Sequence, residues 1–567
     1  MHQTHLLPPS YDEMIEAGHL VRVVNDAVEK IDISALLAQY KGGGTSSYHP
    51  KMLLKVLVYA YTQKIYSSRR IAKALRENIH FMWLSGESCP KFRTINDFRS
   101  SRMKGVIDEV FAAVLEYLIE AGQVKLENYF VDGSKIEANA NKHKVVWAKR
   151  KGNYEKRVRE QIQELLKRIE EENEAEQAEY GDEDLEERGG GSSGEINSER
   201  LKEKIDELNR RLRERNQPNQ EVQEKKKALK KLESDCLPRL ARYEQQTEML
   251  AGRSSYAKAD PDASSMQMKE DRSSGRPWPK PAYNTQLGPE GQFIVGFSVH
   301  GRAGDPGCLI PHLEQVRQNT GGRLPKKIVA DAAYGSEENY AYLEQRGVQN
   351  FLKYNTFYQD THNYQKVEVI RKHQFRAENF RYDPQTDQFI CPANQRLHFQ
   401  YESRYLTDNG YCSTRRNYEC FDCADCPLKS QCTKAKGNRK IRISFRLLEY
   451  RRQARDNLTS QEGQRLRRAR STEVETVFGH IKHNMEFRRF HLRGLEKVKI
   501  ELGLVSIAYN LSKLAARLAV LFFICIKMCY WFSKDKYWGL FGPLFPDSPL
   551  LSFRDQRGGE PWSSGFF

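Results

Sequence analysis

The sequence predicts an α/β protein, on three observations. Strand-like and helical runs alternate between residues 126 and 352, two of those strands end in aspartate, and long helical segments precede and interrupt them. Of the 567 residues, 39% are hydrophobic, enough to bury a sizeable core and to exclude a wholly disordered chain. A mean hydropathy of −0.74 argues against a protein with several membrane spans.

The net charge indicates the kind of partner, and the cysteines indicate the cellular compartment. Lys and Arg number 91 against 75 Asp and Glu, a net +16 that favours a polyanion, nucleic acid first. A basic protein with no such partner is the alternative. Basic residues gather near 69–104 and 465–499. Because no signal peptide is recognisable, we expect a cytoplasmic, nucleoid-associated protein in which the clustered cysteines among the 11 are metal ligands before disulfides.

Residues 1–120 predict an all-α, DNA-binding region. Pro50 suits the first turn of an apolar helix, and Ser67 or Ser68 caps a short basic helix that follows. Short helices with basic faces are what a helix-turn-helix reader of DNA needs, although a solvated basic face is the ordinary alternative. The candidate DNA contacts here are Arg69, Arg70, Arg93 and Arg99.

Residues 121–150, 251–355 and 460–515 predict the α/β body. The first strand covers 129–131 and ends at Asp132, and a hairpin over 283–297 follows. Next come a helix that begins at Pro306, capped by Asp305, and a strand that ends at Asp331. A helix capped by Ser336 and a strand over 348–352 complete the order. The carboxyl ends of such strands are where open α/β sheets place their sites. Asp132 and Asp331 are therefore expected within reach of one Mg²⁺ or Mn²⁺ ion, whose preferred ligands are carboxylate oxygens. Asp305 is alternatively an extra carboxylate.

A helix over about 465–486 offers a third carboxylate. Glu475 lies beside an apolar stripe, and Lys482 stands two turns further on. Such a pair could bind a metal and a DNA phosphate, respectively, whereas an exposed charged face is the alternative. Arg470 belongs to a basic run that leads into the helix and suits phosphate binding.

Two insertions enlarge the body. Residues 151–250 repeat apolar residues at spacings of 4, 3 and 4 on both sides of a Gly/Ser linker, which predicts a helical hairpin or coiled coil. Residues 356–459 are cysteine-rich. Their candidate zinc ligands are Cys391, Cys420, Cys423, Cys426 and Cys432, with an iron–sulfur cluster and free thiols as alternatives.

Residues 516–567 form a C-terminal tail. Its apolar run, 518–526, is shorter than the roughly 20 residues of a membrane span. We expect a buried helix and no stable membrane association, with a membrane-associated tail as the alternative.

Three blocks resemble one family. Residues 131–141 (VDGSKIEANAN), 329–336 (VADAAYGS) and 474–482 (VETVFGHIK) are similar to the signature blocks of bacterial insertion-sequence transposases of the DDE type. Residues 487–494, 508–511 and the N-terminal block over 48–102 extend the resemblance, which covers most of the chain from about residue 5 to 515.

The resemblance implies a ribonuclease-H-like mixed sheet with flanking helices. It also implies a catalytic, metal-binding triad of Asp132, Asp331 and Glu475, with Arg470 as the arginine upstream of the glutamate. The implied reaction is two-metal cleavage of double-stranded DNA at transposon ends, followed by attack of the 3′ hydroxyl on target DNA. By analogy the protein is at least a dimer on DNA. A metal-dependent endonuclease without strand transfer and a non-catalytic DNA-binding regulator are the alternatives.

Overall fold

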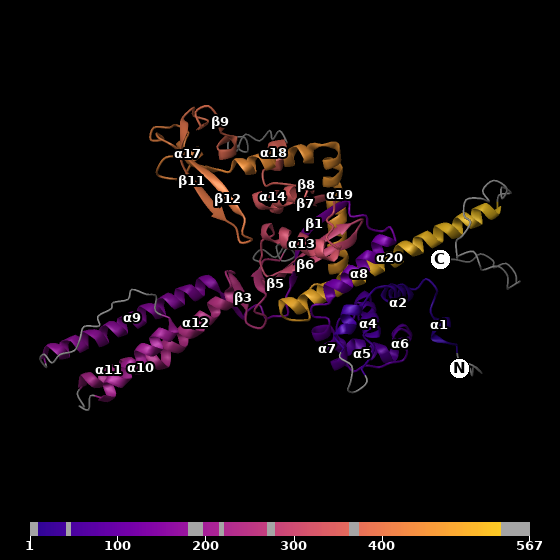
Figure 1. Cartoon of the computed structure of the whole chain (residues 1–567), viewed down its shortest axis with the longest axis horizontal. Helices are drawn as coiled ribbons and strands as arrows, with labels where there is room; N and C mark the ends of the chain where they lie inside the picture. The colour runs from indigo at the N-terminus through magenta and orange to yellow at the C-terminus, as the bar shows by residue number, and fades with distance from the viewer. Residues whose placement is uncertain are drawn as a thin grey trace.

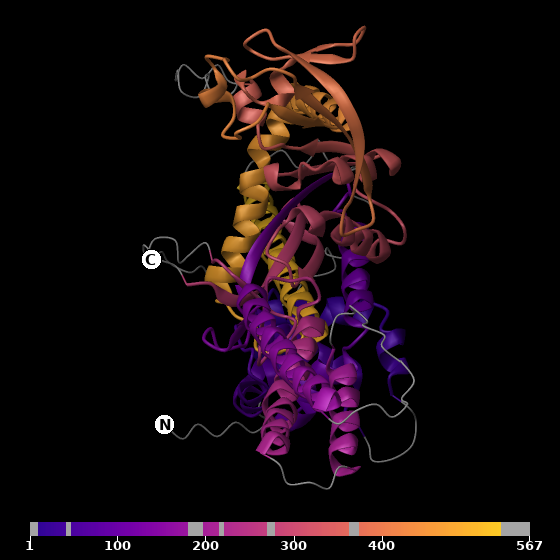
Figure 2. The same ribbon diagram turned by 90° about the vertical axis from the view of Figure 1, so that its left-hand side faces the viewer.

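The structure, a computed structural model, describes residues 9–40, 47–179, 197–214, 220–268, 278–361 and 374–534. Figure 1 shows a central α/β body from which a helical arm extends, with N-terminal helices beneath the body and a small sheet-rich lobe above it. Figure 2 shows the lobe at the top of the molecule and the arm below it, in front of the N-terminal helices. The predicted mixed α/β class is confirmed.

The N-terminal region is helical, as predicted. Pro50 occupies the first turn of α4, whose side chains at Leu54, Val56 and Leu57 are fully buried. Helix α4 packs against α2, α6 and the long α20 (Leu495–Lys534), so the N-terminal helices share one core with the body. The elements are α1 (Tyr11–Met14), α2 (Leu20–Lys30), α3 (Ser34–Ala38), α4 (Pro50–Thr62), α5 (Ser68–Glu77), α6 (Ile79–Ser85), α7 (Phe92–Asp97), the π-helix η1 (Phe98–Arg102) and α8 (Ile107–Glu120).

A mixed sheet forms the body. Its strands are β1 (Asn128–Glu137), β4 (Ser264–Met266), β5 (Lys280–Glu290), β6 (Phe293–His300), β7 (Lys327–Ala330) and β8 (Gln349–Leu352). β1 pairs antiparallel with β5 and parallel with β7, and β7 pairs parallel with β8. On its other edge β5 pairs with β4 and then with β6. The predicted succession of strands and helices is present.

Two strand boundaries differ from the prediction. β1 does not end at Asp132: it continues to Glu137, because β5 goes on pairing with it as far as Ala282. The hairpin turn is also tighter than expected, since β5 reaches Glu290 and only Gly291 and Gln292, both at positive φ, join it to β6. Such a two-residue turn matches the twist of the flanking strands.

Helices cover the sheet. α13 (Leu309–Asn319) and α20 pack on β6, and α19 (Gln461–Gly479) contacts β1, β5 and β7. The side-chain amide of Asn510 in α20 both accepts from the Ile294 N–H and donates to the Ile294 carbonyl, so it completes the backbone bonding of β6. Further elements are the 3₁₀ turns η4 (Pro306–Cys308) and η5 (Ala332–Tyr334), α14 (Glu337–Gln345), α18 (Phe445–Thr459) and the π-helix η7 (His480–Asn484).

The helical arm has a core of its own. It comprises α9 (Ala148–Glu179), α10 (Ser198–Glu214), α11 (Gln220–Lys231), the π-helix η2 (Leu232–Cys236) and α12 (Leu237–Leu250). The predicted apolar positions Val158, Ile162 and Ile169 meet Leu201 and Ile205 inside it. At its base, β2 (Val145–Trp147) pairs with β3 (Ser255–Ala257). The apolar faces of the arm helices therefore pack against one another inside the arm.

The cysteine-rich segment folds as a five-stranded antiparallel lobe, in the order β13-β12-β11-β10-β9. At the end of its long hairpin, the Tyr411 and Ser413 hydroxyls donate to the carboxylate of Glu337 in α14, which anchors the lobe to the body. The elements here are α15 (Phe357–Thr361), η6 (Ala377–Asn379), β9 (Arg381–Asp383), β10 (Gln388–Ile390), β11 (Arg396–Leu406), β12 (Cys412–Cys420), α17 (Lys429–Cys432) and β13 (Lys440–Ile443).

The apolar run near the end of α20 is helical but not buried. Leu518, Leu521 and Phe523 are each 47–64% exposed, since α20 continues beyond the sheet and the N-terminal helices that cover its first part. The expectation of a buried helix is wrong for these residues. By length and composition alone, one described helical stretch, Leu495–Leu521, could cross a membrane, and half of its most apolar window is buried inside the protein.

Buried histidines make the fold sensitive to acid. His312 lies between the Tyr129 hydroxyl at 2.7 Å and the Ser298 hydroxyl at 2.9 Å, and burial lowers its pKa to about 3. Between that value and the ordinary 6.5 the unfolded chain binds a proton that the folded chain does not. The free energy of unfolding therefore decreases as the pH drops, by up to about 1.4 kcal/mol per pH unit.

We therefore expect His312→Gln to lower stability at pH 7 but to flatten its decline between pH 6 and 4. Urea unfolding at a series of pH values measures this slope. His143→Gln, at an exposed histidine, should keep the wild-type slope. A wild-type slope in His312→Gln would contradict the assignment.

Candidate functional site

The sheet brings Asp132 and Asp331 together. In the parallel β1–β7 pair, Val131 lies opposite Ala330, so the two aspartates follow at the next position of each chain. β7 ends there, while β1 runs on past it. Both side chains are partly exposed where the neighbouring strand stops. The two aspartates therefore lie on neighbouring strands, as predicted, but only Asp331 follows a strand end.

A third carboxylate joins them, and it is Asp305. Its Oδ1 accepts from the buried Asn284 and Gln286 side chains of β5, at 2.7 and 3.1 Å. The same oxygen would lie 2.6 Å from a Cβ placed on Gly133. Asp305 makes no side-chain capping bond to the turn that begins at Pro306, so the predicted helix cap is wrong. Its alternative, an extra carboxylate near the strand ends, describes the geometry.

All three aspartates act electrostatically on Tyr334. Its hydroxyl donates to Gln286 Oε1. Burial raises the pKa of Tyr334 well above its ordinary value, and the charges of Asp305, Asp132 and Asp331, in that order of size, raise it further. Like charges gathered at one place favour binding of a cation.

Helix α19 carries the remaining predicted residues. Arg470 lies over the sheet, with Nη1 at 3.6 Å from Asp132 Oδ2. Glu475 is exposed, next to the buried Val474 and Val477 that face the sheet. Two residues earlier, Glu473 is half-buried and accepts from the Gln292 N–H at the β5–β6 turn, and burial raises its pKa.

The donor chemistry of Asp132, Asp305 and Asp331 suits a hard divalent cation, but their arrangement does not yet fit one. Across the described ranges, no group of three or more His, Cys, Asp or Glu side chains is placed to hold a metal ion. The triad of Asp132, Asp331 and Glu475 is therefore not assembled as a ligand set in this conformation.

The predicted DNA contacts are divided between surface and interior. Arg69 and Arg93 are exposed and lie over the ring of Phe92, at 5.2 and 5.9 Å from its centroid. Arg70 is exposed and Lys482 is partly exposed. Arg99 is only 3% exposed, and its guanidinium donates to the Tyr66 carbonyl at 2.6 Å.

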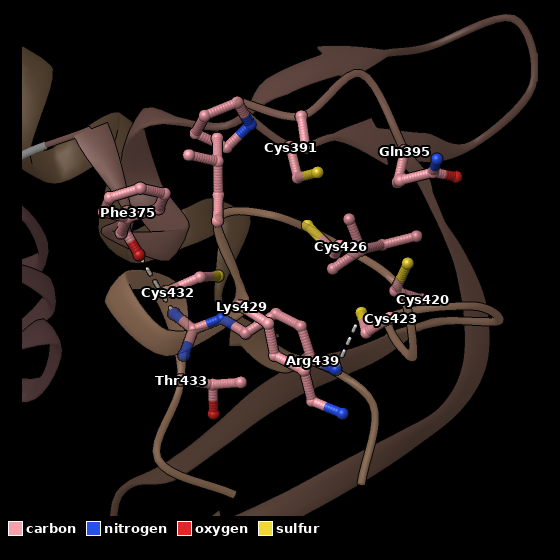
Figure 3. A pocket seen from close by; sticks show the side chains of 14 residues that line it. Phe375, Cys391, Gln395, Cys420, Cys423, Cys426, Lys429, Cys432, Thr433 and Arg439 are labelled. Atoms are coloured by element: carbon pink, nitrogen blue, oxygen red, sulfur yellow. Dashed lines mark hydrogen bonds between the residues drawn. The ribbon is translucent and has the colours of Figure 1, made fainter.

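The five candidate zinc ligands surround one pocket of the lobe. Figure 3 shows Cys391, Cys420, Cys423, Cys426 and Cys432 around it, with the Arg439 N–H donating to Cys423 Sγ at 3.5 Å. Burial, and next the neighbouring Cys423, raise the pKa of the Cys420 thiol to about 12. The lobe thus gathers more thiols than a tetrahedral zinc needs, although they too stand outside ligating geometry.

The structure is that of an α/β protein in which Asp132 and Asp331 lie on neighbouring strands, helix α19 contacts both strands, and the N-terminal region is helical. Residues 390–515 match the family model described as "Transposase DDE domain", and residues 9–101 match "Transposase domain (DUF772)". The predicted resemblance to insertion-sequence transposases of the DDE type is confirmed, and the two domains support a transposase function. No curated protein and no solved structure matches the chain.

Gly133 is the point of closest approach in the site. A Cβ there would meet Gln286 Nε2 at 2.4 Å and Asp305 Oδ1 at 2.6 Å. We expect Gly133→Ala to displace this network and to lower the free energy of unfolding by about 1–3 kcal/mol, as overpacked cores do.

Urea unfolding measures the loss. Gly152→Ala is the matched control, because nothing lies within 4 Å of a Cβ at that helical position. Equal stabilities of Gly133→Ala and wild type would refute the close approach.

Proposed function

We propose that the protein is a DNA transposase that binds transposon ends, cleaves the DNA and joins the freed 3′ hydroxyl ends to target DNA. The observation that carries the proposal is the placement of Asp132 and Asp331 side by side, beneath a helix that belongs to the matched DDE segment. In this proposal Asp132, Asp331 and Glu475 are the catalytic carboxylates.

The sheet order supports a ribonuclease-H-like body. β6, β5 and β1 form an antiparallel set, and β7 and β8 follow in parallel to β1. The helical arm interrupts this set between β1 and β5, and the cysteine-rich lobe follows β8. We propose that both are insertions into one catalytic fold.

The chain's own residues can prepare the site for a phosphodiester. Arg470 offsets the negative charge of Asp132 and places a guanidinium where a DNA phosphate would approach. Asn284 and Gln286 fix Asp305 beside Gly133, which keeps the carboxylates together. A bound Mg²⁺ or Mn²⁺ would supply Lewis-acid chemistry to the reaction. We propose that Glu475 joins the two aspartates only with DNA and metal present.

A cleavage and joining assay tests the triad. With Mg²⁺ and a duplex that carries the element's end, Asp132→Asn, Asp331→Asn and Glu475→Gln should each lose at least about 100-fold in cleavage rate, while a mobility shift shows that they still bind. Glu473→Gln, on the same helix, should cleave within a few-fold of wild type.

Pre-cleaved ends distinguish the outcomes. Joining of their 3′ hydroxyls to target DNA supports a transposase, whereas cleavage without joining would indicate an endonuclease. Binding without any cleavage by wild type would indicate a regulator. Because joining uses two ends, we also propose at least a dimer on DNA.

We propose further that the lobe binds one structural zinc. Convergence of five thiols on one pocket supports this, and metal binding would order a lobe with a small apolar core. Protein purified under reducing conditions should carry about one zinc per chain. Cys423→Ser should lose it, and Cys412→Ser, at an exposed cysteine of the same lobe, should retain it. Less than half an equivalent in wild type would contradict the site.

A further inference from the structure

A polar pocket lies between the N-terminal helices and the segment that follows η7. The start of α5, the helix α7 with η1, and His491 line it. Two contacts hold its walls together: the Tyr66 hydroxyl donates to the Met485 carbonyl at 2.5 Å, and Lys64 pairs with Glu486 at 3.0 Å. The pocket is therefore built from parts more than 400 residues apart in sequence.

The N-terminus of α5 points to an anion. Ser67 stands at the N-cap position of this 10-residue helix but makes no side-chain capping bond. The first N–H groups of a helix need an acceptor, and the helix dipole favours a negative one. By contrast, Ser336 and Ser460 cap α14 and α19 with their own hydroxyls.

The buried side chain of Arg99 also indicates an anion at this pocket. Arg99 lines the pocket and is only 3% exposed. Its Nε has no hydrogen-bond partner. Its other nitrogens donate to neutral oxygens, namely the Tyr66 carbonyl at 2.6 Å, the Tyr61 hydroxyl at 3.2 Å, and Ser68 Oγ and Asn96 Oδ1 at 3.4 Å. Buried guanidinium groups are normally paired with an anion.

Neither nearby carboxylate makes a hydrogen bond to Arg99. Glu501, fully buried, accepts through Oε2 from the His491 and Leu492 N–H groups at 2.9 and 3.0 Å, and its Oε1 lies 3.2 Å from His491 Nδ1. Burial lowers the pKa of Arg99, whereas Tyr61 and then Glu501 raise it, so Glu501 acts on the guanidinium through its charge alone. Asp97, on the rim, lies 4.0 Å from Arg102 Nε. Arg69 and Arg93, stacked on Phe92, add two exposed positive charges at the pocket.

We propose that this pocket seats one phosphate group of the DNA backbone, held by the α5 N-terminus, Ser67 and the Arg69 and Arg93 side chains over the buried charge of Arg99. The inference rests on the proposed function, because it takes DNA as the source of the phosphate. Free inorganic phosphate has the same chemistry and is the other source to be tested. Since His491 and the N-terminal helices share the pocket, a seated phosphate would fix the DNA relative to the catalytic body.

Ser67→Asp is the decisive variant. Aspartate is a good N-cap, so it should preserve or raise the melting temperature while its carboxylate occupies the anion position. Ser67→Asn, an equally good but neutral cap, is the matched control. Arg93→Gln, at an exposed side chain, removes one rim charge without disturbing the core.

The measurement is the Kd of a 30-base-pair duplex over a range of NaCl concentrations. We expect Ser67→Asp to bind about tenfold more weakly and to lower the slope of log Kd against log salt by about 1, equally on end-bearing and unrelated duplexes. Arg93→Gln should change both in the same direction, and Ser67→Asn should stay within about threefold of wild type. A wild-type Kd or a wild-type slope in Ser67→Asp would overturn the proposal.

Inorganic phosphate separates the two sources. If the pocket serves DNA, phosphate should compete with the duplex no better than chloride at equal ionic strength. Phosphate that raises the melting temperature of wild type but not of Ser67→Asp, with duplex binding unchanged in the variant, would show a free-phosphate site and overturn the DNA assignment. Duplex binding is scored without cleavage, so failure of the pocket and failure of the transposase proposal are distinguishable.

Discussion

The parallel pairing of β1 with β7 is the constraint on which the candidate site depends. Because Val131 lies opposite Ala330, the next residues of the two chains, Asp132 and Asp331, emerge at the same height of the sheet. A slip of one residue would turn either aspartate to the other face. Glu290 helps to fix that register: its carboxylate accepts four consecutive backbone N–H groups, from Lys125 to Asn128, at 2.7 to 3.1 Å, where the chain enters β1.

The long helix α20 joins the N-terminal helices to the α/β body. Its Asn510 bonds to both backbone groups of Ile294 in β6, and its Glu501 accepts from the N–H groups of His491 and Leu492, of which His491 lines the proposed phosphate pocket. The same helix packs on α2, α4 and α8 of the N-terminal region. Through these contacts the N-terminal helices hold a defined position relative to the strands that carry Asp132 and Asp331.

The sequence predicted what local pattern controls and missed what tertiary contacts decide. The succession of strands and helices is predictable because apolar runs and turn residues mark each element. The strand-end rule holds for Asp331, whereas Asp132 lies within β1, which β5 extends to Glu137. The Pro306 that follows Asp305 predicts a helix cap, whereas the side-chain amides of Asn284 and Gln286 in β5 hold the Asp305 carboxylate. The burial of Arg99 and the exposure of Leu518 and Phe523 depend on which surfaces α20 and the N-terminal helices cover, and no local pattern reports that.

The helical arm leaves and re-enters the body through one pair of short strands, β2 and β3, and buries its own apolar residues. Its length is consequently uncoupled from the rest of the molecule. In related chains the arm could gain or lose whole helical turns in matched pairs without altering any contact in the main sheet. The arm can therefore change in length while the strands that carry Asp132 and Asp331 keep their pairing.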